Sequence, residues 1–267
     1  MRAGYIRFYN CSVKVKSAFM ALLLTGCATA PVGFYESAFP TEMPMSMGLT
    51  SDLGRRYLGI PYDTTGRGGT PHGFLILPSA SLSPVSWLTV SADFTSAFTA
   101  RMIRIKPTVF ATDGMAAALV FSGGRVKGEG DDSWSPMPWG IWGIWDDYGD
   151  TTRYEITNLC GGAIFSFCPQ GWYTSQVQPR IILNIGPKLF FANMDYYRVV
   201  HTEDPKDSIL TYQFSGNVWD PGGFMGTSVE WGHGEWDLEF SVLSVERPLL
   251  GKRTWTPYAG GKLRLKF

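Results

Sequence analysis

From about residue 69 onward, apolar and polar residues alternate along the chain. Residues 88–94 give the clearest case, and residues 225–231 and 236–242 repeat the pattern. In the first of these, one face holds Leu88, Val90, Ala92 and Phe94, and the other holds Thr89, Ser91 and Asp93. A period of two is typical of a half-buried β-strand, because successive side chains point to opposite faces. No helix-length pattern with a period of 3.6 competes, so the sequence predicts an all-β fold.

We expect about twelve strands, separated by turn residues such as Gly161-Gly162, Gly186-Pro187 and Asp220-Pro-Gly-Gly223. The predicted strands are residues 69–78, 88–94, 101–111, 115–125, 152–160, 163–169, 177–186, 188–200, 208–217, 225–231, 236–242 and 256–267.

Two all-β architectures bury such faces. A β-sandwich encloses the apolar faces between two sheets, whereas a transmembrane β-barrel turns them outward to lipid around a polar lumen. Many aromatic residues stand at predicted strand ends, where interfacial girdles of a barrel would place them. They are Trp87, Phe98, Trp172, Tyr196, Tyr197, Trp219, Trp255 and Tyr258. We therefore expect an antiparallel up-and-down transmembrane β-barrel of about 10–12 strands, with a β-sandwich as the alternative.

The N-terminus has the pattern of an export signal. Residues 1–16 carry four basic residues and no acidic one, and a short apolar stretch of about ten residues follows. The stretch ends in Leu24-Thr25-Gly26-Cys27, which resembles the bacterial lipobox. The resemblance implies cleavage before Cys27 and lipidation of its thiol. Ala28 follows in place of the inner-membrane retention residue Asp, which implies sorting to the outer membrane of a Gram-negative envelope by the lipoprotein-sorting machinery.

The C-terminus ends in an amphipathic strand, with Leu263, Leu265 and Phe267 on one face and Arg264 and Lys266 on the other. This ending resembles the C-terminal insertion signal of outer-membrane β-barrels. The resemblance implies recognition by the barrel-assembly machinery and pairing of this strand with the first one.

The domain organisation follows from these signals. We expect a signal peptide over 1–26, a tether and entry segment rich in proline and glycine over 27–68, and a β-barrel over 69–267. Residues 48–59, beginning Gly-Leu-Thr-Ser-Asp, resemble the opening of a family of uncharacterised small outer-membrane proteins, which would start the barrel at about residue 46. A lipid on Cys27 would lie on the periplasmic side. The closing strand also ends there, and both termini on one side require an even strand number.

Composition narrows the function classes. The chain has 45% hydrophobic residues, and its 23 Lys and Arg balance its 23 Asp and Glu, which excludes disorder and gives no electrostatic footprint for nucleic acid. Removing residues 1–26 takes away four positive charges, which leaves 19 basic against 23 acidic residues, or −4.

The candidate chemistry is sparse, and we expect no cofactor or metal. His233 stands near a predicted hairpin tip, with acidic residues and Ser228 close in sequence, and is the one weak catalytic candidate, for a lipid hydrolase. No nucleophile elbow accompanies it. A tryptophan-rich segment followed by acidic residues is interpreted first as part of a girdle or of the packing, and the alternative is a platform that binds a ligand. If the protein has a ligand site, we expect it here. Its residues are Trp139, Trp142, Trp145, Asp146, Asp147 and Asp150.

An exported protein meets an oxidising compartment, which favours a disulfide between Cys160 and Cys168. A hairpin that turns at Gly161-Gly162 would set Cys160 opposite Ala163 and leave Cys168 several residues away, and one continuous strand would separate the two cysteines by about 8 × 3.3 Å, or roughly 26 Å. Either regular arrangement forbids the bond, so a disulfide would imply an irregular loop. The question stays open at this point.

Together these patterns predict an outer-membrane barrel lipoprotein, structural or porin-like in passing small solutes, without catalysis. Its partners would be outer-membrane lipids and the two export machineries. The alternatives are a lipid-anchored soluble β-sandwich that binds a glycan or protein, and an outer-membrane lipid hydrolase using His233.

Overall fold

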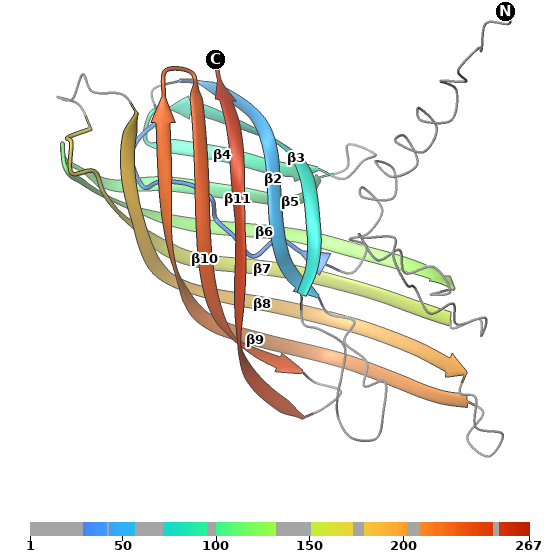
Figure 1. Ribbon diagram of the computed structural model, residues 1–267. Coiled ribbons are helices and arrows are strands. Elements are labelled where there is room, and N and C mark those ends of the chain that lie inside the picture. Colours follow the sequence, from blue (N-terminus) through green and yellow to red (C-terminus); the bar gives the residue numbers. More distant parts are fainter. Residues whose placement is uncertain are drawn as a thin grey trace, which may run out of the picture.

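The computed structural model describes residues 29–41, 43–56, 72–94, 100–131, 151–172, 179–201, 209–247 and 251–267. These residues form a closed barrel of ten antiparallel strands and one short additional strand, β1 (Figure 1). The strands are β1 (Thr29–Ala30), β2 (Met45–Arg56), β3 (His72–Val85), β4 (Leu88–Phe94), β5 (Ala100–Ala111), β6 (Met115–Asp131), β7 (Thr151–Phe167), β8 (Arg180–His201), β9 (Ile209–Trp231), β10 (Gly234–Arg247) and β11 (Lys252–Lys266). None of the described residues belongs to a helix long and apolar enough to cross a membrane.

Each strand from β2 to β11 pairs with its neighbour in sequence, and β11 pairs with β2 to close the ring. The closing register runs from Gly260 opposite Asp52 to Lys266 opposite Ser46. The expected up-and-down barrel is therefore confirmed, as is the pairing of the last strand with the first. A single closed ring also overturns the alternative of two stacked sheets.

The strand count is ten rather than twelve. Three pairs of predicted strands are single long strands, which leaves nine, and β2, which lies in the expected tether, is the tenth. The predicted turns at Gly161-Gly162, Gly186-Pro187 and 220–223 lie inside β7, β8 and β9. They stand side by side, with Gly162 opposite Lys188 and Pro187 opposite Gly223. At these positions the backbones approach closely, since a Cβ on Gly186 would lie 1.8 Å from the carbonyl oxygen of Ala163. The glycines therefore serve close packing within continuous strands.

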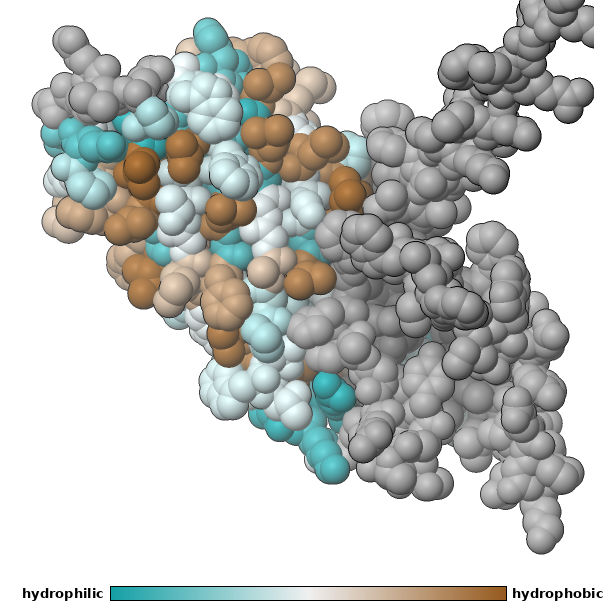
Figure 2. Space-filling model, in the orientation of Figure 1, coloured by the Kyte–Doolittle hydropathy of each residue, from teal (hydrophilic) through white to brown (hydrophobic). Residues whose placement is uncertain are grey.

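Side chains alternate between the two faces of the wall as the sequence predicts. In β10, Trp236, Leu238 and Phe240 point outward, whereas Asp237 and Glu239 are buried inside. Large apolar side chains are exposed on the outer face of nearly every strand, with exposed fractions that reach 68% at Val109 and 70% at Trp255. On the face shown in Figure 2, hydrophobic residues spread across the wall and most hydrophilic ones lie towards its ends.

The aromatic girdle is only partly as expected. Trp87, Tyr197, Trp219 and Trp255 are exposed on the outside, while Phe98 lies outside the described residues. Trp172, Tyr196 and Tyr258 are buried instead. Their expected place in a girdle was wrong, because strand-end position alone does not say which face a residue occupies.

The two ends of the barrel differ. One end carries the short connections at 86–87, 112–114 and 232–233, and also Phe267, whose backbone N–H donates to the carbonyl of Met45 (2.8 Å). We call this the turn end. The other end carries most of the longer connections, including 57–71 and 132–150, and we call it the loop end.

The N-terminal part departs from the expected division at residue 69. The barrel starts at Met45, as the resemblance over 48–59 implies, so part of the expected tether is wall. Another part, residues 29–41, lies inside the barrel, where Ala30 to Phe39 are buried. Figure 1 shows this stretch as a dark blue trace that runs through the ring of strands. We call residues 29–41 the plug segment.

Candidate functional site: a plugged lumen

The plug segment runs through the lumen from the loop end to the turn end. It begins as β1, where Thr29 pairs with Arg56 and Ala30 with Arg55, at the end of β2 that lies next to the connection 57–71. It finishes at Thr41, whose N–H donates to the carbonyl of Ser86 (2.9 Å) in the β3–β4 turn. Because the chain then reverses into β2, the plug segment and the first wall strand run in opposite directions.

Two wall carboxylates bind the amides of the plug segment. Asp52 on β2 accepts hydrogen bonds from the N–H groups of Val32 (2.7 Å) and Gly33 (3.1 Å). Glu239 on β10 accepts from those of Phe34 (2.8 Å) and Tyr35 (3.1 Å). Hydrogen bonds to an ionised acceptor are roughly twice as strong as neutral ones, so four consecutive amides are held tightly.

Cations on the wall bind the carbonyls of the same segment. Lys188 on β8 donates to Val32 (2.9 Å) and also pairs with Glu239, while Lys106 on β5 donates to Ser37 (2.7 Å). Arg264 on β11 donates to the carbonyl of Tyr35 at 3.3 Å. The backbone of the plug segment thus finds side-chain partners of both signs, as a buried backbone requires.

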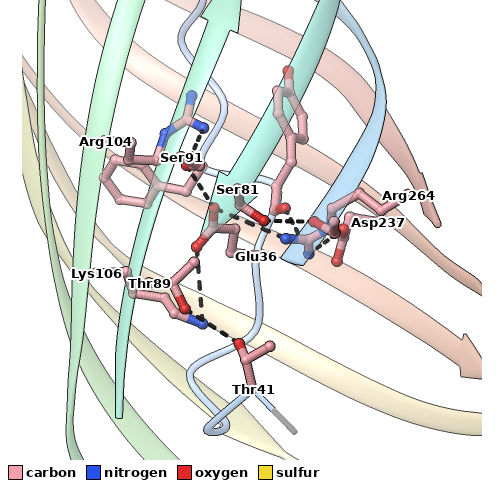
Figure 3. Close-up of polar contacts among 12 residues, drawn as sticks. Glu36, Thr41, Ser81, Thr89, Ser91, Arg104, Lys106, Asp237 and Arg264 are labelled. Atoms are coloured by element: carbon pink, nitrogen blue, oxygen red, sulfur yellow. Dashed lines mark hydrogen bonds and ion pairs between the residues drawn. The ribbon is translucent and has the colours of Figure 1, made fainter. Parts of the chain in front are cut away.

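Glu36 is the charged side chain that the plug segment brings into the lumen. Its carboxylate accepts a hydrogen bond from the hydroxyl of Ser91 (3.0 Å) and lies 3.8 Å from Lys106 and 3.9 Å from Arg264. Figure 3 shows the glutamate pointing into this cluster of wall residues, with Arg104 nearby. A buried carboxylate without nearby cations would destabilise the fold. The wall supplies two such cations beside Glu36, namely Lys106 and Arg264.

The opposite side of the plug segment packs against an apolar wall. Phe34 meets Phe224 edge to face, with ring centroids 5.5 Å apart, and Phe39 stacks on Trp172 at 4.7 Å. Lys188 lies over the Phe34 ring, 4.2 Å from its centroid, which adds a cation–π contact. The segment therefore has one polar and one apolar side, each matched to the strands that face it.

Wall glycines leave room for the plug aromatics. A Cβ on Gly162 would lie 2.9 Å from the ring of Phe34, and one on Gly260 would lie 2.2 Å from the hydroxyl of Tyr35. Tyr35 itself has a φ of 49°, which is uncommon for a residue with a side chain. Such a conformation persists only where its surroundings fix it, here through Glu239 and Arg264.

Further ion pairs line the wall. Arg264 reaches Glu235 and Asp237, both at 2.7 Å, and Lys266 pairs with Glu230. Among the described residues, eight buried acids stand against seven buried bases. The acids are Glu36, Asp52, Asp93, Asp220, Glu230, Glu235, Asp237 and Glu239, and the bases are Arg55, Arg104, Lys106, Lys188, Lys262, Arg264 and Lys266. The lumen is nearly neutral, and side chains rather than an open channel fill it where the plug segment lies.

His233 and the acids that are close to it in sequence have different hydrogen-bond and ion-pair partners. His233 lies in the exposed β9–β10 turn, where its Nδ1 is 3.1 Å from the carbonyl oxygen of Lys266. Glu235 and Glu230 point into the lumen and pair with Lys266. Ser228 donates to Asp237 at 2.5 Å, away from the imidazole. Closeness in sequence does not make these groups partners, because His233 lies in the turn itself, whereas the acids and Ser228 lie on the inward faces of the strands that the turn connects.

The remaining sequence candidates have mixed outcomes. Cys27 and the ligand-site candidates at 139–150 lie outside the described residues. Cys160 and Cys168 are buried free thiols, the first within β7 and the second directly after its end. Because β7 continues without a turn from Cys160 to its end at Phe167, the two thiols lie far apart along the chain direction. No group of three or more potential ligand residues that could hold a metal occurs in the described part of the chain.

The outer wall has a hollow of about 980 Å³, lined mainly by outward side chains of β7 to β10. Its lining includes the apolar side chains of Phe165, Ile185, Met225 and Phe240. It also includes the small side chains of Ala117 and Ala259 on neighbouring strands. It opens on the outer face and so belongs to the apolar wall rather than to the lumen.

Sequence reasoning missed the plug segment. Residues 31–40 show no period, and their partners are far away in the chain, with 205 positions between Phe34 and Glu239. One feature of the sequence could have indicated the plug segment: the polar faces of β10 and β11 carry many charged residues. In a narrow barrel such charges need partners inside the lumen.

The sequence and the fold were compared with known proteins. No family model matches the sequence, and no curated protein matches it either. Among solved structures, Neisserial surface protein A (NspA) is 11% identical, with 86% of this chain and 98% of that chain covered and a TM-score of 0.31. Outer-membrane expressed OmpT of Vibrio cholerae is 10% identical, with 85% and 78% covered and a TM-score of 0.22. Because both TM-scores are low, we draw no conclusion about function from these neighbours.

Proposed function

We propose that the chain is an integral outer-membrane β-barrel lipoprotein whose lumen is closed by its own plug segment. It serves as a structural barrel or as a gated pathway for small solutes, without catalysis. Passage of a solute requires displacement of residues 29–41, because these residues fill the lumen between the charged and the apolar wall.

The observation that carries this proposal is the direction of the side chains. A soluble protein hides its large apolar residues, whereas this barrel exposes them on the outside and buries its charges within. Exposed apolar surface of this extent marks contact with lipid or another protein, and the pairing of β11 with β2 closes the ten strands into one ring, as a membrane-spanning sheet requires. Every barrel strand except β4 has at least twelve residues, which exceeds the 9–11 needed to cross a bilayer at a tilt.

The sidedness follows from the connections. In outer-membrane barrels the periplasmic turns are short and the extracellular loops longer. The turn end, which carries Phe267, therefore faces the periplasm, and the loop end faces the outside. The lipobox at Cys27 supports export and a lipid anchor.

The proposal is tested by placing an arginine on the outer face at two depths. Phe240 lies in the middle of β10, and Trp255 lies near the loop end of β11; their exposed fractions are 46% and 70%. In a bilayer, arginine costs about 2–4 kcal/mol at the midplane and about 0–1 kcal/mol near the interface. We expect Phe240→Arg to lower the free energy of unfolding in lipid vesicles by about 2–4 kcal/mol and Trp255→Arg to change it by less than about 1 kcal/mol.

The readout is the change of gel mobility on heating, which follows folded and unfolded barrel in urea. Equal and small effects of both variants would refute a lipid-facing wall, because exposed substitutions in water usually change stability by less than about 0.5 kcal/mol. Purification without detergent as a monomer would refute it as well.

A further inference from the structure

The plug segment fixes the end of the barrel from which the N-terminal part of the chain emerges. Thr29 lies opposite Arg56, at the loop end of β2, whereas Phe267 lies beside Met45 at the turn end. Met45 and Arg56 are eleven positions apart, or about 36 Å along a strand at about 3.3 Å per residue. The two ends of the described chain therefore lie at opposite ends of the barrel.

Cys27 is only two positions before Thr29. A fully extended chain advances at most about 3.6 Å per residue, so the cysteine lies within roughly 7 Å of Thr29. This reach is too short to return through the lumen to the turn end. Whatever the cysteine carries, the chain presents it at the loop end.

We propose that the lipidated N-terminus of this protein is displayed on the outer surface of the outer membrane, with its acyl chains in the outer leaflet. This inference rests on the proposed function, which makes the loop end extracellular. It corrects the sequence-based expectation of a periplasmic anchor, which assumed that the chain enters the barrel directly from the lipid. The plug segment crosses the barrel once through the lumen. This crossing places the N-terminal lipid on the opposite side of the membrane from Met45.

The contacts along the passage hold the segment on one path through the closed barrel. The wall binds the amides of residues 32–35 through Asp52 and Glu239, and the carbonyls of Val32 and Ser37 through Lys188 and Lys106. The apolar side of the segment is equally matched. A chain that left its lipid in the periplasmic leaflet would have to give up β1 and the contacts next to it. The lipid thus holds the N-terminal end of the plug segment at the loop end, and the connection to β2 holds its other end at the turn end.

The test places a short peptide tag at three sites of the full chain, one per variant, and detects it with an antibody on intact and on permeabilised cells. The first site is between Ala28 and Thr29. The second is after Gly140, in the connection at the loop end, and the third is after Ser175, in the connection between β7 and β8 at the turn end. We expect the first and second tags to be detected on intact cells and the third only after permeabilisation.

The lipid is tested on the same cells by mass spectrometry. No lysine or arginine stands between Cys27 and Arg55, so trypsin releases residues 27–55 as one peptide. We expect this peptide to carry acyl chains, and Cys27→Ala to abolish the acylated form while the barrel still shows heat-modifiable mobility.

Detection of the first tag only after permeabilisation, together with surface detection after Gly140, would overturn the inference and leave the outer-membrane barrel standing. An unacylated peptide 27–55 would overturn the lipid anchor on either side. If the tag after Gly140 were hidden on intact cells although the barrel is folded, the outer-membrane proposal itself would fail.

Discussion

The carboxylate of Asp52 offers the sharpest way to loosen the plug segment. Asp52→Ala removes the shared acceptor of the N–H groups of Val32 (2.7 Å) and Gly33 (3.1 Å), both buried. Each buried donor left without a partner costs about 1–3 kcal/mol, so the two together cost about 2–6 kcal/mol. The cost falls on the closed state alone, because amides of a withdrawn plug segment are solvated by water. At about 1.4 kcal/mol per factor of ten, the fraction of open barrels should rise at least about 30-fold.

The assay is single-barrel conductance in a planar bilayer, with the fraction of time spent open as the measured quantity. Asp220→Ala is the matched control, because Asp220 is an equally buried wall carboxylate whose partners are Arg55 (2.9 Å) and the backbone N–H of Glu246. It should destabilise the barrel without opening it. If Asp52→Ala stayed as closed as the parent, or if both variants opened equally, the assignment of Asp52 as a clamp on the plug segment would be wrong.

Three further outcomes follow from the lumen and the turn end. Arg264→Met leaves the buried carboxylate of Asp237 without its cation and leaves Glu235 with Lys266 alone, and it should lower the free energy of unfolding by about 3–5 kcal/mol. Lys262→Met, on the same strand, should cost less than about 1 kcal/mol, because the Nζ of Lys262 lacks a hydrogen-bond partner among the described residues; urea titration of the heat-modifiable band compares the two variants, and equal losses would contradict the difference. Gly260→Ala should disturb Tyr35, whose hydroxyl would lie 2.2 Å from the new Cβ, and also the pairing of β11 with β2, because the carbonyl oxygen of Ser51 would lie 2.4 Å from it. It should raise the open fraction in bilayers and lower the free energy of unfolding, and an unchanged conductance trace would contradict the role of Gly260 in seating Tyr35. His233→Ala should leave both stability and the lipid A of the host unchanged, and altered lipid A in mass spectra would restore the catalytic hypothesis.

The sequence predicts the wall well because the wall repeats a local rule. Leu238 and Phe240 point outward and Asp237 and Glu239 inward, as their alternation requires. The final strand, which ends at Phe267, pairs with the first as its amphipathic ending implies. Each of these features depends on neighbours in sequence or on one closing contact.

Strand lengths were harder to predict, since glycine has two uses that look alike in sequence. Gly161-Gly162 and Gly186-Pro187 have the composition of turns. In the barrel they lie within strands, where a side chain at Gly162 or Gly186 would collide with the neighbouring backbone, and one at Gly162 also with Phe34. Only the position of the neighbouring strand distinguishes a turn from a close approach, and a single sequence does not contain that position.

The plug segment and the charges of the wall explain one another. An extended segment inside a closed barrel has little opportunity to join the sheet, because the wall strands use most of their backbone groups on their neighbours. Apart from the short pairing of β1, its amides and carbonyls must therefore find side chains. Carboxylates such as Asp52 and Glu239 replace the carbonyls of a missing strand, and cations such as Lys188 and Lys106 replace its amides. A water-filled pore would need no such alternation of sign, so these inward charges point to an internal segment of the same chain as their partner.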